Sequence, residues 1–197
     1  MTEAITFSNI IPASERSASI ESELYLLVKE CIAHNRSAQK KLYDIYAPAA
    51  YGIIKRYLFS NDTAANEILN DSFYKIFTKL EQYSFQGAFE GWIRRIVVNT
   101  VTDYLRKNIK DVQQHKEVQP EDGYVEGGSV ENLCYKELLR LVHTLPEMQL
   151  AVFNLFVFEN YSHKEIGTLL NINENNSRWY LNDARRRLKE KIQSVIE

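Results

Sequence analysis

Apolar side chains recur every three or four residues along most of this chain, which is the period of an α-helix with one buried face. In the first half of the chain, the pattern predicts amphipathic helices over residues 20–32, 42–57, 65–80 and 89–104. Pro48 lies inside the second of these and is expected to bend it or break it locally. No stretch shows the alternation typical of a β-strand. The predicted fold class is therefore all-α, and the first half is predicted to be a four-helix bundle.

A change in composition separates this bundle from the rest of the chain. Residues 111–135 contain six acidic residues and one basic residue, a local charge of −5, together with one proline and three glycines. Such a segment indicates a flexible acidic linker between two small helical domains. The predicted organisation is a flexible N-terminal arm (1–20), a first helical domain (21–110), the linker (111–132) and a second helical domain (133–197).

The strongest local signal lies between residues 161 and 188. Ser162 and Glu165 have the spacing of a capping box, which begins a short helix. Asn171 can adopt the left-handed conformation that ends this helix, and Asn173 can cap the next one. A short helix, a three-residue turn and a longer basic helix together predict a helix-turn-helix motif.

The second helix of this motif carries side chains suited to reading DNA. Asparagine pairs well with adenine and arginine with guanine, and further basic residues suit phosphates. The inward positions of the helix are predicted to be Ser177, Leu181, Ala184, Leu188 and Ile192. The predicted DNA contacts are Asn175, Asn176, Arg178, Trp179, Asn182, Arg185 and Arg186. The alternative is a solvated basic helix at the end of a bundle, with Trp179 as a packing residue.

The overall charge does not by itself indicate a nucleic-acid-binding protein, because the formal net charge is −2. The positive charge is instead concentrated locally: residues 84–110 and 174–191 each carry a local charge of +3. DNA binding is therefore expected on two separate surfaces rather than over the whole molecule.

Several other functions are disfavoured. Cys31 and Cys134 are far apart, so neither a disulfide nor a structural zinc site is expected, and no metal or cofactor is predicted. The four histidines are scattered, and no metalloprotease motif or glycine-rich phosphate loop occurs, so the chain is not expected to be an enzyme. Residues 1–23 do not resemble a signal peptide, and no apolar run could span a bilayer. A cytoplasmic protein without membrane insertion is expected.

Separated stretches of the chain resemble the extracytoplasmic-function (ECF) sigma factors of bacterial RNA polymerase. Leu145-Pro-Glu-Met-Gln-Leu-Ala-Val-Phe, Tyr161-Ser-His-Lys-Glu-Ile-Gly-Thr-Leu-Leu and Ala184-Arg-Arg-Arg-Leu-Lys resemble region 4 of that family. Leu42-Tyr-Asp-Ile-Tyr-Ala-Pro, Ala65-Asn-Glu-Ile-Leu-Asn-Asp-Ser-Phe and the run from Trp92 to Arg106 resemble region 2. The resemblance implies that region 2 binds core RNA polymerase and opens the −10 promoter element, and that region 4 binds the −35 element. It also implies an anti-sigma protein as a partner.

The resemblance assigns roles to two polar stripes. The residues implied to bind the polymerase are Glu67, Asn70, Asp71 and Tyr74. The residues implied to contact the −10 element are Arg95, Asn99, Asp103 and Arg106, whose spacing places them on one helix face. The first stripe could also be an ordinary solvated helix face, and Asp103 could form an ion pair with Arg106 or Lys107. Phe89 and Trp92 fit the core better than base stacking.

The main alternative is a stand-alone helix-turn-helix regulator, which would be a dimer reading two half-sites, whereas a free sigma factor is expected to be a monomer. The recognition helix departs from the family at Asn176-Ser177, Tyr180 and Asp183, so the family's −35 preference cannot be transferred. The sequence leaves open the promoter, the regulated genes, the anti-sigma protein, the activating signal and the arrangement of the two domains. A compact free state is expected, because the acidic linker would face basic surfaces.

Overall fold

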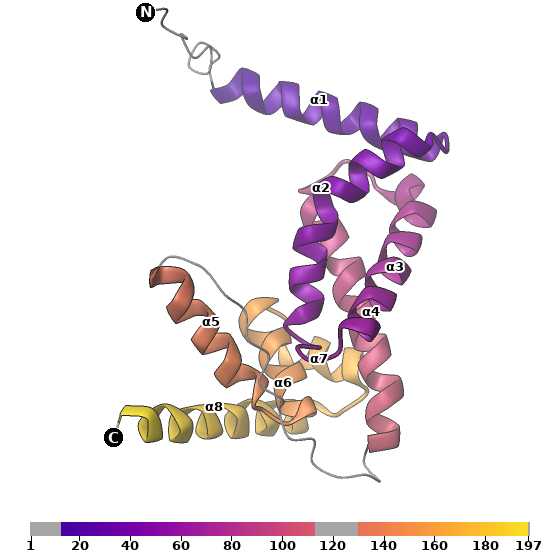
Figure 1. Cartoon of the computed structure of the whole chain (residues 1–197). Coiled ribbons are helices and arrows are strands. Elements are labelled where there is room, and N and C mark those ends of the chain that lie inside the picture. Colours follow the sequence, from indigo (N-terminus) through magenta and orange to yellow (C-terminus); the bar gives the residue numbers. More distant parts are fainter. Residues whose placement is uncertain (1–12, 113–129, 197) are drawn as a thin grey trace, which may run out of the picture.

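The computed structural model describes residues 13–112 and 130–196, and it describes the side chains of residues 22–108 and 137–193. These parts of the chain are helical and contain no strand, which confirms the all-α prediction (Figure 1). The elements are α1 (Ala13–Ile32), α2 (Arg36–Lys55), α3 (Asp62–Lys79), the 3₁₀ turn η2 (Leu80–Gln82), α4 (Phe89–Val112), α5 (Val130–His143), α6 (Glu147–Phe153), the π-helical segment η3 (Asn154–Phe158), α7 (His163–Leu170) and α8 (Glu174–Ile196).

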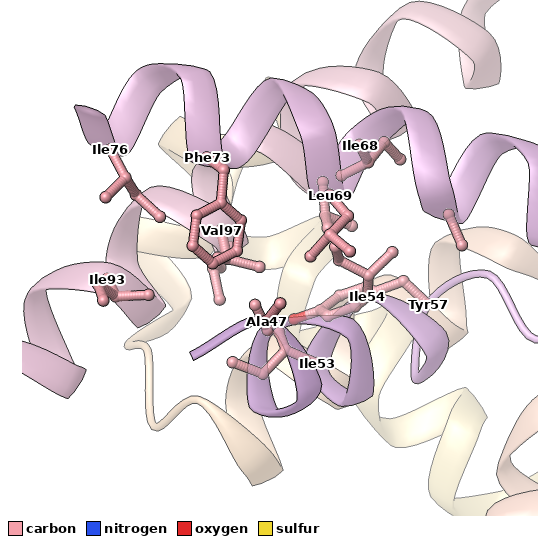
Figure 2. Close-up of a cluster of buried hydrophobic side chains, with 14 of the residues drawn as sticks. Ala47, Ile53, Ile54, Tyr57, Ile68, Leu69, Phe73, Ile76, Ile93 and Val97 are labelled. Atoms are coloured by element: carbon pink, nitrogen blue, oxygen red, sulfur yellow. The ribbon is translucent and has the colours of Figure 1, made fainter. Parts of the chain in front are cut away.

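Helices α1–α4 form what we call the N-terminal bundle. Within it, α2, α3 and α4 pack against one another in every pairwise combination. The side chains of Ile54, Ile76 and Val97 are fully buried where the three helices meet (Figure 2). Asparagine side chains begin two of these helices, since Asn35 accepts a hydrogen bond from the backbone of Ser37 and Asn61 accepts one from the backbone of Ala64.

Helix α2 continues through Pro48, so of the two expected outcomes, a bend or a local break, the break does not occur. Proline removes the hydrogen bond to the carbonyl four residues earlier, that of Asp44. Pro48 and Asp44 are both exposed, so water can satisfy that carbonyl. The buried residues Leu42 and Ile54 lie on either side of the proline and keep the helix on the core.

Helix α1 begins at residue 13, within the segment expected to be a loose arm, and packs through its C-terminal half. Val28 and Cys31 are buried against the bundle, whereas Leu26 is exposed. Burial, reinforced by the charge of Glu30, raises the pKa of the Cys31 thiol to about 11. The thiolate is therefore scarce at neutral pH, which fits a packing role for this residue. The side chain of Cys134 lies outside the described side chains.

Helices α5–α8 form what we call the C-terminal bundle. Helix α8 is its longest element and packs against α5, α6 and α7. Val142, Leu145, Leu150 and Ala184 form a small buried cluster between α5, α6 and α8. Most of the predicted acidic linker (111–132) lies outside the described residues, which reach Val112 at the end of α4 and resume at Val130.

The two bundles pack directly against each other in the described residues, which is the compact arrangement expected for the free chain. In Figure 1, α6 and α7 lie near the C-terminal end of α2 and alongside α4, and both contact α4. One continuous set of buried apolar residues runs from Val97 and Leu105 of α4 to Leu155 and Ile166. The contacts described here involve packed side chains, whereas the expectation rested on linker charge.

No helix among the described residues combines the length and the apolar character needed to cross a lipid bilayer.

His143, at the end of α5, takes part in this packing. Its ring stacks on Phe59 of the N-terminal bundle, with ring centroids 4.4 Å apart. Burial lowers the pKa of His143, and the positive charge of Lys55 adds to this effect, while backbone carbonyls of Lys55 and Arg56 oppose it. The packed arrangement therefore favours the neutral ring.

We predict that acidification weakens the packing between the bundles. The packed state holds His143 with a lowered pKa, so it binds fewer protons than the separated state, where the pKa is about 6.5. The free energy that favours the packed over the separated bundles is thus unaffected well above pH 6.5. It decreases as the pH falls below that value. Hydrogen exchange of the backbone amides around Phe59, at several pH values, measures the effect. A His143→Phe variant keeps an aromatic ring but cannot titrate, and it should lose this pH dependence; an unchanged dependence would contradict the prediction.

Candidate nucleic-acid interface

Helices α7 and α8 form the helix-turn-helix motif that the sequence predicts. The Ser162 hydroxyl accepts a hydrogen bond from the Glu165 backbone N–H (3.3 Å), and the Glu165 carboxylate accepts one from the Ser162 backbone N–H (2.8 Å). These hydrogen bonds lower the pKa of Glu165. Asn171 ends α7 in the left-handed conformation (φ 55°, ψ 46°), and Asn173 accepts a hydrogen bond from the Asn176 backbone N–H (2.6 Å). All the predicted capping roles are confirmed.

Gly167 allows the turn after α7 to lie close to that helix, a role that was not among the sequence-based predictions. A Cβ atom at this position would lie 2.8 Å from the backbone oxygen of Ile172. Carbon and oxygen do not approach so closely, so only glycine fits without displacing the turn. A glycine inside a short amphipathic helix, one turn before a predicted turn, was the available signal.

The inward face of α8 is mostly as predicted. Ser177, Leu181 and Ala184 are buried, and Leu188 is partly buried. Ile192 is 39% exposed, so its predicted burial is wrong, because the C-terminal end of α8 projects beyond α6 (Figure 1).

His163 joins the two helices of the motif, which sequence reasoning did not foresee. Its Nδ1 atom lies 3.0 Å from the hydroxyl oxygen of the buried Ser177 on α8. The imidazole ring also stacks on Phe156, with centroids 4.7 Å apart. Partial burial, together with the positive charge of Arg178, lowers the pKa of His163. This contact fixes how α8 is presented relative to α7.

The outward face of α8 is open to solvent. Trp179 is 59% exposed and makes an edge-to-face contact with Tyr180 (5.1 Å between centroids), so it is not a core residue of the described structure. Arg178 pairs with Glu174 at 2.5 Å, and the Arg185 guanidinium lies over the Phe156 ring. The predicted DNA contacts are all exposed: Asn175, Asn176, Arg178, Trp179, Asn182, Arg185 and Arg186.

Asp183 has a structural position within this basic helix. Its carboxylate accepts hydrogen bonds from Arg186 (2.6 Å), Arg187 (2.7 Å) and Gln149 of α6 (2.9 Å). These donors, Arg187 foremost, hold the pKa of Asp183 well below its ordinary range. The side chain is only 9% exposed. An acid in the recognition helix therefore attaches α8 to α6 and orients two arginines.

A second polar surface lies on α4. Arg95 is exposed, and Asn99, Asp103 and Arg106 are partly exposed. Asp103 pairs with Arg106 at 2.7 Å, and Lys75 of α3 lies 3.8 Å from its carboxylate. The ion pair considered as an alternative role for Asp103 is therefore present.

Phe89 and Trp92, near the start of α4, belong to the packing of the N-terminal bundle. Phe89 is buried and Trp92 is partly buried. Their rings stack with centroids 5.6 Å apart, and both rings contact Tyr83. This arrangement agrees with the preferred packing role.

A third polar surface lies on α3. Tyr74 is 71% exposed, the largest exposure among the exposed large apolar residues of the described structure. Its exposed neighbours on the same stripe are Glu67, Asn70 and Asp71. The opposite face of α3 carries the buried Ile68, Phe73 and Ile76. The stripe is thus presented to solvent by a helix whose other face is fixed in the core.

No group of three or more histidine, cysteine, aspartate or glutamate side chains that could hold a metal ion occurs among the described residues.

Two family models match separate parts of the chain. Sigma-70 region 2 matches residues 42–110, and Sigma-70 region 4 matches residues 135–188. The first match contains α3 and most of α2 and α4, and the second contains the helix-turn-helix.

Curated relatives match nearly the whole chain. The ECF RNA polymerase sigma-E factor of Haemophilus influenzae is 23% identical over 86% of this chain and 95% of its own length. The protein of the same name from Escherichia coli K12 is 26% identical over 87% of this chain and 95% of its own length. Among solved structures, the sigma factor RpoE of Bartonella quintana, in complex with the anti-sigma factor NepR, has a TM-score of 0.52 at 18% identity. That match covers 78% of this chain and 96% of the sigma factor, and it shows a shared fold.

A helical bundle followed by a helix-turn-helix, with each part matching a sigma-70 region in the family's order, defines a transcription initiation factor. The chain belongs to the sigma-70 family and is an RNA polymerase sigma factor of the ECF type. The alternative of a stand-alone regulator is not favoured, because the N-terminal bundle matches region 2.

We predict that Gly167→Ala destabilises the C-terminal bundle by about 1–3 kcal/mol, because the added methyl group would force the turn away from α7. Gly52→Ala is the matched control: this exposed α2 position has nothing within 4 Å of the added Cβ, so the change should stabilise the chain by about 0.5–1 kcal/mol. Urea unfolding followed by circular dichroism measures both. Equal stability of the Gly167→Ala variant and the wild type would contradict the described turn.

Proposed function

We propose that three exposed surfaces of this sigma factor divide the work of transcription initiation. The α3 stripe docks on core RNA polymerase, the α4 surface engages the −10 element, and the outward face of α8 reads the −35 element. The protein acts in the cytoplasm, is a monomer when free, and supplies binding contacts rather than a catalytic step. The observation that carries the proposal is the exposure of the whole predicted reading face of α8 on a complete helix-turn-helix.

The α3 stripe suits docking on a protein partner because it combines a large aromatic ring with acids. Exposed aromatic residues are enriched at the centres of protein interfaces, where the ring can be buried at low entropic cost. Tyr74 supplies such a ring, and Glu67 and Asp71 supply negative charge around it. The surface therefore favours a groove with basic groups on the polymerase.

The α4 surface suits the opening of DNA because basic and amide groups lie together on a rigid helix. Arg95 and Arg106 can hold phosphates of the separated strands. Asn99 can hydrogen-bond an exposed base and so offset a few kcal/mol of unstacking. Asp103 pairs with Arg106 and lies close to Lys75, so it is placed to orient the side chains of Arg106 and Lys75.

The α8 surface suits base reading in the major groove. Asn175, Asn176 and Arg178 lie in its first turns, where the residues of a recognition helix reach base edges. Trp179 offers an apolar surface to a thymine methyl group. Arg185 and Arg186 lie further along the helix and suit phosphates.

We further propose an anti-sigma protein as a partner. The support is the Bartonella sigma factor, whose solved structure contains an anti-sigma factor and which shares the fold of this chain.

We predict that run-off transcription with core polymerase requires both region 2 surfaces, in distinguishable ways. Glu67→Lys should reduce binding to core polymerase at least tenfold, because it reverses a charge within the docking stripe. Asn99→Ala should leave binding to core polymerase unchanged but reduce transcripts from duplex promoters at least tenfold, with recovery on templates already melted at −10.

Glu81→Lys makes the same charge change as Glu67→Lys at an exposed position outside the stripe, and it should behave like the wild type. If the wild-type chain neither binds core polymerase nor yields transcripts with defined starts, the proposal fails.

We predict that Trp179→Ala and Arg185→Ala have different effects on the −35 element. Trp179→Ala should reduce the binding free energy by about 1–3 kcal/mol through one base pair and relax the base preference there. Arg185→Ala should weaken binding to all promoters alike and reduce the salt dependence of binding. Holoenzyme binding to a randomised −35 library at several salt concentrations measures both effects. Gln193→Ala, at the exposed far end of α8, is the control. An unchanged base preference in the Trp179→Ala variant would contradict this role.

A further inference from the structure

The contact between the two bundles contains a buried acid. The side chain of Glu159, which follows η3, is only 1% exposed. Its carboxylate accepts a hydrogen bond from Arg56 at the end of α2 (2.6 Å) and another from Arg94 of α4. The acid comes from the C-terminal bundle and both cations come from the N-terminal bundle.

Further polar contacts surround this acid. The Arg94 guanidinium also donates to the backbone carbonyl of Phe158 (2.6 Å), and the buried Asn154 donates from Nδ2 to the backbone carbonyl of Arg56 (2.8 Å). The Arg56 guanidinium lies over the Phe158 ring, 5.3 Å from its centroid. Five residues of two bundles thus make a network that a loose encounter between domains would not produce.

None of these residues belongs to the three surfaces assigned above. Glu159 is not on α7 or α8, Arg56 caps α2, and Arg94 precedes Arg95 on α4. A buried carboxylate needs cationic partners, and it loses them when the bundles separate. The network therefore depends on the arrangement of the bundles rather than on the fold of either one.

In the arrangement that this network stabilises, the chain cannot bind both promoter elements at the same time. Elements centred near −35 and −10 are about 25 base pairs apart, which is about 85 Å of duplex at 3.4 Å per base pair. In this structure α7 contacts α4, and α7 also packs on the recognition helix α8, which is only 23 residues or about 35 Å long. The two reading surfaces are thus held much closer together than their targets.

The contact also reaches the −10 surface itself. Helix α7 packs against α4, and the positive charge of Arg95 on α4 helps to lower the pKa of Glu165 at the start of α7. The same charge opposes the raised pKa of Tyr161, which lies just before α7. Helix α7 therefore faces a residue that the proposed function assigns to the −10 element.

We infer that Glu159 is the latch of a closed, self-inhibited state, in which it clamps Arg56 and Arg94 and prevents the two bundles from reading a promoter together. Opening exchanges these contacts for water and for the contacts made on the polymerase. The free chain then restrains its own activity before any partner acts. The inhibitory part of this inference rests on the proposed function, whereas the latch itself does not.

Small-angle X-ray scattering of the full-length free chain tests the latch directly. Glu159→Gln keeps the shape of the side chain but removes its charge, and it should enlarge the radius of gyration and raise the open population at least tenfold. Arg94→Gln should act in the same direction, and the double variant should add little to either single change. Asp44→Asn, which removes an exposed ion pair with Lys40 within α2, should match the wild type. Circular dichroism establishes that each variant keeps its helices.

Run-off transcription at limiting concentrations of the chain tests the inhibitory role. Glu159→Gln should reach half-maximal transcription at a concentration at least threefold below that of the wild type, with an unchanged maximum. Equal scattering of wild type and variant overturns the latch, and expansion without any shift of the half-maximal concentration overturns self-inhibition. If neither protein supports transcription, the assigned surfaces fail, while scattering still decides the latch.

Discussion

The arrangement of this molecule depends on how a buried carboxylate is neutralised. Removing one partner from a buried ion pair generally costs about 3–5 kcal/mol, since the remaining charge stays without water. Glu159 lies between two arginines from different helices of the other bundle, so it specifies the orientation in which the bundles meet. The apolar residues that continue from one bundle into the other supply contact area, but such contacts are not directional. Polar contacts therefore determine how the bundles are oriented, and apolar contacts hold them together.

The distribution of charge explains how a nearly neutral protein can be specialised for DNA. Positive charge gathers on α4 and α8, while acids take local roles that keep those helices in place. Asp103 and Asp183 both lie within basic helices and pair with their arginines. A formal net charge of −2 thus describes the whole chain poorly, because the acids near the proposed DNA-binding surfaces orient cations as well as offset them.

Local signals in the sequence were sufficient for the helices and for the helix-turn-helix. Ser162, Asn171 and Asn173 act through hydrogen bonds and backbone conformations that involve near neighbours, so their spacing predicts their roles. Helix periodicity likewise predicted that Trp179 and Tyr74 would be exposed. The sequence left open whether Pro48 would bend or break its helix, and no break occurs, because propensity gives the local cost of proline but not the packing that outweighs it.

The contacts between distant segments could not be predicted. Glu159 and Arg56 are 103 residues apart, and nothing in the spacing of either residue indicates its partner. The same holds for Gln149 and Asp183, and the sequence presented Asp183 only as a departure from the family. Periodicity shows which face of a helix is buried, but it does not show what that face meets.

The attachment of Asp183 to α6 has a consequence for how such a protein can change over evolutionary time. Residues 175–182 contain most of the exposed side chains proposed to read the −35 element, and their replacement disturbs little within the bundle. The following turn is different, because Asp183, Arg186 and Arg187 share hydrogen bonds that hold α8 in place. Under the proposed function, promoter preference can therefore change through substitutions in the first part of the helix, while the second part keeps the angle at which α8 packs on α6.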